Sequence, residues 1–192
     1  RDTKLAKEYY LKSYELGNSR AAYLLGEMNI QYPSDDAAAL KYYLDAVERN
    51  YDFAKISLGD AYHYGRGVPK NDEIAYNWYM QAKEKNYPKV YLNLGKYHLD
   101  RKEYDEAEQY FLTAVQKGMR SAYTLLGDLY CNEQFHKYNI DEGLYWYEKG
   151  ADENIISSLN RLAKMTYQGI GVVQDAQKAA ALYQKAIDYG SY

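Results

Sequence analysis

The chain has 192 residues, with 24 Lys and Arg against 27 Asp and Glu, which gives a formal net charge of −3 at pH 7. This near balance, without a basic run, argues against sequence-independent binding of nucleic acid, which depends on cationic contacts to phosphates. No apolar run approaches the roughly 20 residues that a membrane-spanning helix needs, so we expect no membrane insertion. A single cysteine, Cys131, excludes an intramolecular disulfide. We expect a soluble protein, either of the cytoplasm or of a compartment reached after removal of a leader sequence.

An aromatic residue recurs along the chain within similar flanking sequence. Successive copies stand 33, 36, 32, 36 and 36 residues apart. A small residue (Ala, Gly or Ser) stands four residues before and three residues after the aromatic, which places all of them on one face of a helix. Small residues there allow a neighbouring helix to approach closely. The recurring aromatic residues are Tyr10, Tyr43, Tyr79, Phe111, Tyr147 and Tyr183.

A Leu-Gly pair forms a second marker with the same rhythm, at spacings of 33, 36, 32 and 36 residues. It lies in helical sequence ahead of each aromatic-bearing helix. Each unit is therefore predicted to contain helix A, which carries Leu-Gly, then a turn, then helix B, which carries the aromatic. The glycines of this marker are Gly26, Gly59, Gly95 and Gly127, and Ala163 stands in the same position of the last unit.

These markers predict an all-α protein in a single array, in which a leading helix B at 1–17 is followed by five helix pairs. The predicted pairs occupy residues 18–50, 51–86, 87–118, 119–154 and 155–190. Seven residues after each aromatic stands Gly or Asn, which tolerates the left-handed conformation that closes a helix. These closing residues are Gly17, Asn50, Asn86, Gly118, Asn154 and Gly190. Acidic residues near the helix starts, as in "SDD" and "NDE", are expected to cap the helices.

Two stretches carry a resemblance to a known family, "LGDAYHYGRGVPKNDEIAYNWYMQA" and "YQGIGVVQDAQKAAALYQKA". Their Leu-Gly, Gly-x-Gly-Val loop and Ala-x3-Tyr-x2-Ala resemble the Sel-1-like repeat, a relative of the tetratricopeptide repeat. The stretch "LGKYHLDRKEYDEAEQYFLTA" departs from the pattern because it lacks the glycine loop. The stretch "LYCNEQFHKYNIDEGLYWYEKG" keeps a long loop without glycine. The resemblance implies a right-handed α-solenoid of antiparallel helix pairs.

The glycine-rich "GRGVPK", residues 65–70, raises the question of a phosphate-binding loop. Such a loop follows a strand and ends in Gly-Lys-Ser/Thr at the start of a helix. This segment follows a helix and lacks the final Ser or Thr, and Pro69 has no amide proton to donate. The segment is therefore predicted to be a turn between two helices.

Catalytic and metal-binding patterns are scarce. His63, His98 and His136 stand in no metal-ligand spacing, and no nucleophile elbow occurs. His98 aligns with apolar packing positions and is predicted to lie in the core. We therefore expect no catalytic residues, no metal and no cofactor. A paired-carboxylate hydrolase acting on an envelope component remains an alternative without a supporting pattern.

In the resembled family the A helices line a concave binding face. Positions two before the Leu of Leu-Gly carry Tyr23, Ile56 and Leu92, which predict an exposed apolar strip with charged neighbours. The alternative is that tighter winding buries these residues. The full set of predicted partner-binding residues is Tyr23, Glu27, Ile56, Asp60, His63, Leu92, Lys96, Thr124 and Asp128.

The predicted function is that of a non-catalytic scaffold or adaptor that binds a protein or peptide on this face. Some bacterial members of the resembled family are immunity proteins, so an immunity-type protein that blocks one folded effector is the alternative. A spacer that self-associates through its end helices is a third reading. The 26 tyrosines against three phenylalanines indicate either a contact surface rich in tyrosine or a codon bias.

Overall fold

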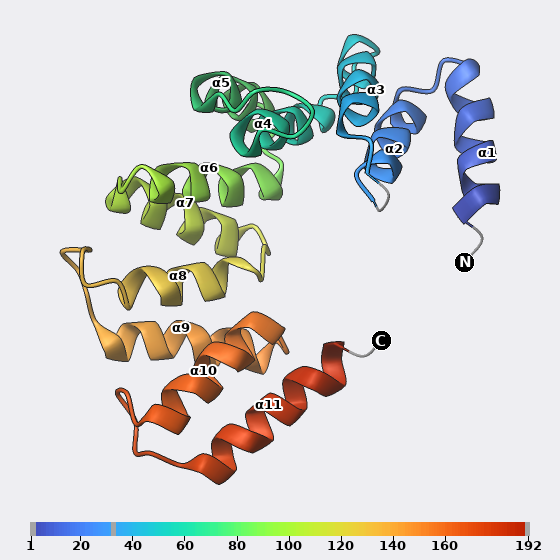
Figure 1. The fold of residues 1–192 in the computed structure, drawn as a ribbon. Helices are drawn as coiled ribbons and strands as arrows, with labels where there is room; N and C mark the ends of the chain where they lie inside the picture. The colour runs from blue at the N-terminus through green and yellow to red at the C-terminus, as the bar shows by residue number, and fades with distance from the viewer. Residues whose placement is uncertain (1–2, 32–33, 191–192) are drawn as a thin grey trace. The chain divides into compact units, whose positions relative to one another are not determined.

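A computed structural model of the chain describes residues 3–31 and 34–190, and within these ranges it contains eleven α-helices and no strand (Figure 1). The prediction of an all-α fold built from helix pairs is confirmed. The helices are α1 (Thr3–Glu15), α2 (Ser19–Asn29), α3 (Asp36–Glu48), α4 (Ala54–Tyr64), α5 (Asp72–Lys83), α6 (Pro88–Asp100), α7 (Tyr104–Gln116), α8 (Ala122–Tyr130), α9 (Ile140–Asp152), α10 (Ile156–Gln168) and α11 (Ala176–Gly190).

The chain forms two compact units, Arg1–Tyr97 and His98–Tyr192, and the boundary falls inside α6. In the first unit α2 packs on α3, α4 packs on α5, and α3 also contacts α4. In the second unit α7 contacts α8, α8 packs on α9, α9 contacts α10, and α10 packs on α11. We call the even-numbered helices A helices and the odd-numbered helices B helices, following the predicted order within each repeat.

Each repeat buries its small and branched apolar positions between consecutive helix pairs. In the first unit one cluster joins Ala39, Tyr43 and Ala46 of α3 to Ala54 and Leu58 of α4. Helix α4 thus covers the helix B that precedes it, as stacking in a repeat array requires. The second unit repeats this arrangement, because side chains of α9 and α10 share one apolar cluster.

The predicted helix ends are confirmed at five of the six Gly and Asn positions. Asn50, Asn86 and Asn154 have φ of 66°, 58° and 58°, and Gly17 and Gly118 have φ of 88° and 83°. Gly190 is the last residue of α11, and the residues that follow it lie outside the described range, so the prediction at this position stays untested.

The helix starts use both Asp and Asn as caps. Asp35 accepts a hydrogen bond from the Ala38 amide at 2.9 Å, and Asp175 accepts one from the Lys178 amide at 2.8 Å. At α5 and α9 the capping residue is instead an asparagine, and the predicted acidic residues occupy the first turn that follows. Acidic residues in that turn oppose the positive end of the helix dipole.

The segment "GRGVPK" is a turn between α4 and α5, as predicted, with Gly65 and Gly67 at φ of 70° and 71°. Gly67 has a second role that the sequence did not indicate. A Cβ at this residue would lie 2.5 Å from the carbonyl oxygen of Asp36, at the start of α3. Because Gly67 has no side chain, the turn can pack against the B helix of the preceding repeat. Gly171 approaches Ile140 at the start of α9 in the same way.

The long loop without glycine, residues 131–139, is fixed to the preceding repeat by other means. Phe135 is buried and contacts the rings of Tyr104 and Tyr130. The ammonium of Lys137 lies 2.5 Å from the buried carboxylate of Glu108 in α7. The hydroxyl of Tyr130 donates a hydrogen bond to the same carboxylate. An aromatic side chain and an ion pair thus hold this loop where the other long loops use glycine.

Candidate functional site

The aromatic residue of helix B fits against the glycine of helix A in the same repeat. A Cβ at Gly26 would lie 2.5 Å from Cε1 of Tyr43, and a Cβ at Gly59 or Gly127 would approach its tyrosine, Tyr79 or Tyr147, even more closely. Glycine is therefore needed at these positions because the flat ring occupies the space of any side chain. This contact explains why the Leu-Gly marker and the aromatic marker recur with the same spacing.

The tyrosine hydroxyl then bonds to the acidic residue that follows the glycine. Tyr43 donates to Glu27, Tyr79 to Asp60 and Tyr147 to Asp128, each at 2.8 Å. Burial, together with the adjacent carboxylate, raises the pKa of these hydroxyls above the ordinary 10.0, so they remain hydrogen-bond donors at neutral pH. In the third repeat the aromatic is Phe111, which has no hydroxyl, and a lysine replaces the acid.

The same carboxylates also bond to the A helix of the following repeat. Glu27 accepts from the hydroxyl of Ser57 at 3.3 Å, and Asp60 accepts from the side-chain amide of Asn93 at 2.5 Å. The carboxylate of Asp128 lies 2.9 Å from Nε of Arg161. Ser57, Asn93 and Arg161 each stand directly before the Leu of their Leu-Gly or Leu-Ala pair. Three acids predicted as partner-binding residues therefore join consecutive repeats, while their side chains remain half-exposed.

Four other residues of the predicted partner-binding set are buried, so their expected exposure is wrong. The side chains of Ile56, His63, Leu92 and Thr124 face neighbouring helices. Nδ1 of His63 lies 3.0 Å from Oδ1 of Asp72 in α5, and the hydroxyl of Thr124 lies 2.6 Å from that of Ser158 in α10. The burial agrees with the alternative of tighter packing between A helices.

The two remaining predicted residues are accessible in part. Tyr23 is half-buried, and its ring lies 5.2 Å from the ring of Tyr51 and 5.5 Å from that of Phe53. Lys96 is half-buried on α6. His98 is buried, as predicted, and its ring stacks on that of Tyr110 at 5.2 Å. An exposed apolar strip along Tyr23, Ile56 and Leu92 is therefore absent from this surface.

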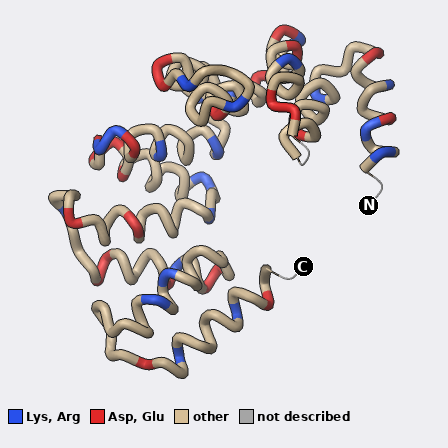
Figure 2. The backbone as a smooth tube through the Cα atoms, in the orientation of Figure 1, with Lys and Arg blue, Asp and Glu red and all other residues tan. Residues whose placement is uncertain are grey.

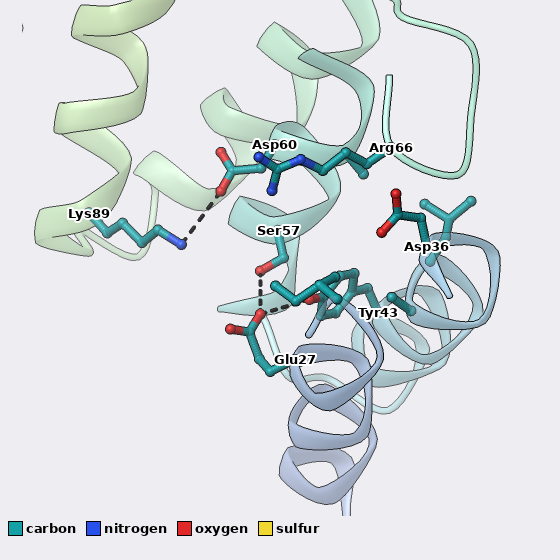
Figure 3. A pocket seen from close by; sticks show the side chains of 11 residues that line it. Glu27, Asp36, Tyr43, Ser57, Asp60, Arg66 and Lys89 are labelled. Carbon is teal, nitrogen blue, oxygen red and sulfur yellow. Dashed lines mark hydrogen bonds and ion pairs between the residues drawn. The ribbon is translucent and has the colours of Figure 1, made fainter. Parts of the chain in front are cut away.

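The first unit contains a cavity of about 140 Å³ between consecutive repeats (Figure 3). Tyr43 and Ala61 form part of its wall, and five charged side chains line it. In Figure 3 the ammonium of Lys89 points to Asp60, at 3.5 Å, and Arg66 enters from the loop after α4 on the side of Asp36. The charged lining residues are Glu27, Asp36, Asp60, Arg66 and Lys89.

The second unit contains a cavity of about 370 Å³ at the same repeat positions. Asp128 and Tyr147 take the places of Glu27 and Tyr43 relative to the Leu-Gly and aromatic markers. The rest of the lining differs in chemistry. Ile140, Lys164, Met165 and Ile170 stand where the first cavity has Asp36, Asp60, Ala61 and Arg66. The second cavity still has charges of both signs, and it adds apolar side chains at positions that are charged or small in the first. Its charged lining residues are Asp128, Glu133, Arg161 and Lys164.

The sequence prediction missed several lining residues of these cavities, above all Asp36, Arg66, Lys89 and Lys164. Each comes from a neighbouring helix or from the loop between A and B helices. Finding them requires the alignment of adjoining repeats in space. The sequence offers one signal of contact between consecutive repeats. Where an acid follows Leu-Gly, a hydrogen-bond donor stands directly before the Leu of the next repeat.

The described part of the chain holds no cluster of three or more His, Cys, Asp or Glu side chains arranged to bind a metal ion. Among the described helices, none has the length and apolar character needed to cross a membrane. Cys131 is a free, half-buried thiol whose pKa is raised by burial.

Comparison with known proteins identifies the family. The model of the Sel1 repeat matches residues 1–18, 19–51, 53–87, 120–155 and 156–191, which is well over half of the chain. The chain belongs to the Sel1 repeat family. The Sel1 fold is typically a non-catalytic scaffold for protein–protein interaction.

Three similar proteins show the range of these relatives. An uncharacterized protein of Neisseria meningitidis serogroup B is 27% identical over 187 residues, or 97% of this chain and 40% of the relative. The chain thus spans less than half the length of this curated relative. A Sel1 repeat protein from Oxalobacter formigenes superposes with a TM-score of 0.77 at 25% identity, over 95% of this chain and 78% of that one. The immunity protein Pa5087 of Pseudomonas aeruginosa has the same fold, with a TM-score of 0.65 at 21% identity, over 90% of this chain and 66% of that one.

Proposed function

We propose that the chain is a non-catalytic scaffold that binds a protein or peptide through the surface of its A helices. The observation that carries this proposal is the recurrence of a cavity at one repeat position in both units, each lined by side chains from consecutive repeats. The first cavity, of about 140 Å³, is smaller than the roughly 300–1,000 Å³ typical of small-molecule sites, and the second, of about 370 Å³, lies at the lower end of that range. The first has room for a side chain of a partner rather than for a cofactor.

The two cavities would accept different side chains. The first has charged groups of both signs, with Arg66 free of ion pairs among the described residues. It suits a polar or charged side chain. The second places Ile140, Met165 and Ile170 beside charged groups of both signs, and it suits an apolar anchor flanked by polar or charged groups. The half-exposed residues of the predicted set that remain part of the proposed surface are Tyr23, Glu27, Asp60, Lys96 and Asp128.

The test is an affinity capture from the native cell lysate with chemical crosslinking and identification of the bound proteins. Arg66→Glu and Lys164→Glu each reverse a charge in one cavity. Lys41→Glu on α3 reverses an exposed charge that lines neither cavity and serves as the matched control. Circular dichroism checks that every variant keeps its helix content.

A partner retained by the wild type and by Lys41→Glu, but lost by a folded cavity variant, supports the proposed surface. Retention of the same partner by all four chains contradicts it. Loss from Lys41→Glu as well indicates nonspecific charge attraction, which also contradicts it.

An immunity-type function is the second candidate, and the fold shared with Pa5087 is the observation in its favour. The same capture separates the two functions. A single folded effector bound in a tight, stoichiometric complex indicates immunity, whereas several partners bound more weakly indicate an adaptor.

A further inference from the structure

In the first unit, the A helices and the B helices carry net charges of opposite sign (Figure 2). We call residues 18–34, 51–71 and 87–97 the A segments, since they hold the A helices of this unit and the loops after them. Residues 3–17, 35–50 and 72–86 are the B segments. The A segments contain six Lys and Arg against three Asp and Glu, a net charge of +3, and the B segments contain seven against nine, a net charge of −2. A positive surface on the A helices favours a partner of negative charge.

The three acids of the A segments already have partners within the fold. Glu27 accepts hydrogen bonds from two hydroxyls, and Asp60 accepts two hydrogen bonds and lies 3.5 Å from the ammonium of Lys89. Asp52 forms ion pairs with two lysines, at 2.7 and 3.1 Å between carboxylate oxygen and ammonium nitrogen. None of these carboxylates therefore depends on a cation from a binding partner.

Three of the six cations, by contrast, have no ion pair among the described residues, namely Arg20, Arg66 and Lys96. Lys89 and Lys96 stand at i and i+7 on α6, so they lie on one face of that helix. Arg20 has the same repeat position as Lys89, five residues before the Leu of Leu-Gly, and Arg66 lies in the turn after α4. We name Arg20, Arg66, Lys89 and Lys96 the cationic set of the first unit.

Arg66 is presented at a fixed place, although the turn does not need an arginine. Its amide donates a hydrogen bond to the carbonyl of Ala61 at 2.8 Å, and the glycines on either side have left-handed φ of 70° and 71°. Its side chain is exposed, places the guanidinium 5.0 Å from the ring centroid of Tyr64, and lines the cavity of about 140 Å³. Ile170 stands at this position in the other glycine turn, where the glycines have φ of 70° and 67°. The turn thus forms without the charge, which leaves the guanidinium available to a ligand, and the fixed backbone lowers the entropy lost on binding.

We propose that the cationic set of the first unit binds an acidic segment of a partner protein, with one Asp or Glu side chain of that segment held by Arg66 at the cavity. This inference rests on the proposed function and adds the chemistry of the partner. A guanidinium donates two parallel hydrogen bonds to a carboxylate, which gives this contact a defined geometry. The other three cations attract the flanking acids of the segment over roughly 10 Å at 0.1 M salt.

The first probe is a library of random 12-residue peptides, each fused through its C-terminus to a phage coat protein. The fusion removes the C-terminal carboxylate, so that only side chains supply acids. The library is selected on the immobilised full chain, and the bound peptides are sequenced. We expect the selected peptides to be enriched in Asp and Glu relative to the input library.

The most enriched peptide is then synthesised with a fluorescent label and a C-terminal amide, and its binding is measured by fluorescence anisotropy. Arg66→Gln removes the proposed anchor, and Lys41→Gln removes one exposed positive charge from α3, in a B segment outside the cavity. Circular dichroism checks that both variants keep their helix content. We expect Arg66→Gln to bind about tenfold more weakly than the wild type, and Lys41→Gln to bind like the wild type.

A double-mutant cycle identifies the carboxylate that Arg66 holds. Each acid of the peptide is replaced singly by its amide, Asp by Asn or Glu by Gln. We expect one of these replacements to weaken binding to the wild type about tenfold and to have little further effect on Arg66→Gln. The remaining replacements should weaken both chains alike.

Selected peptides without acidic enrichment, no selected peptide at all, or equal binding by Arg66→Gln and Lys41→Gln each overturn the proposal. The lysate capture judges the proposed function separately. A partner that is lost by a cavity variant but binds through a segment without acids overturns this inference alone. A partner retained by every variant overturns both.

Discussion

Gly127 is the position where the contact between helix A and helix B is most open to a direct test. In a solvent-exposed helix, Gly→Ala stabilises by about 1 kcal/mol because alanine has the higher helix propensity. Here the added Cβ would overlap the ring of Tyr147, which is 3% exposed and held at its hydroxyl by Asp128. Overpacking of a core costs about 1–3 kcal/mol. We therefore expect Gly127→Ala to lower the free energy of unfolding by about 0–2 kcal/mol, and to be about 1–3 kcal/mol less stable than a Gly→Ala change that gains the helix propensity without the overlap.

The assay is urea unfolding followed by far-UV circular dichroism, with Gly190→Ala as the control. A Cβ at Gly190 would meet Cδ1 of Ile156 at 3.6 Å, an ordinary contact, so the control should be neutral or slightly more stable. A Gly127→Ala chain as stable as Gly190→Ala would refute the steric argument.

Phe135→Ala should lower the free energy of unfolding by about 3–5 kcal/mol. Tyr138→Ala, at a 43% exposed residue of the same loop, should change it little. Equal effects of the two substitutions in denaturant titrations would show that the loop has no buried anchor. Tyr79 and Tyr147 have pKa values raised above 10.0 by burial and by adjacent carboxylates, so the stability they contribute is complete below pH 10 and is lost as the pH rises through the folded-state values. Tyrosinate absorbance of both should therefore appear only with loss of helix signal, and ionisation near pH 10 in an intact fold would contradict this. Hydrogen bonds from two lysines lower the pKa of Asp52, so its stabilising effect is present above 3.8 and is lost as the pH falls below that value. Asp52→Asn should be less stable than the wild type at pH 7 and equally stable in acid, and an equal deficit at both would contradict the assignment.

The repeat markers were sufficient to predict the helix pairs because the residues that form them contact each other within one repeat. Gly59 and Tyr79 touch each other, so their spacing records a physical constraint. The exposure of Ile56 could not be predicted in the same way. Helical periodicity places this residue on a face of α4, but it does not tell which neighbouring helix covers that face. Its burial depends on how consecutive A helices pack, and that is a tertiary property.

The acids that follow Leu-Gly show how function and structure can be confused in a repeat protein. Asp60 is predicted as a binding residue because it is a charged neighbour of the expected apolar strip on the A helices. The structure shows that its carboxylate accepts from Tyr79 and Asn93. Some of the tyrosine excess in the sequence thus has a structural cause, since each such acid needs a hydroxyl donor within its own repeat.

The paired residues at the repeat junctions restrict which repeats can follow one another. An acid in one repeat matches a donor in the next, as Asp128 matches Arg161. The third repeat, with Lys96 in place of the acid, is followed one repeat later by Leu125 in place of the donor. A gene duplication or recombination that moved a single repeat would separate such matched halves and leave a carboxylate facing an apolar side chain. Repeats of this chain are therefore expected to tolerate exchange only in blocks that keep both sides of a junction together.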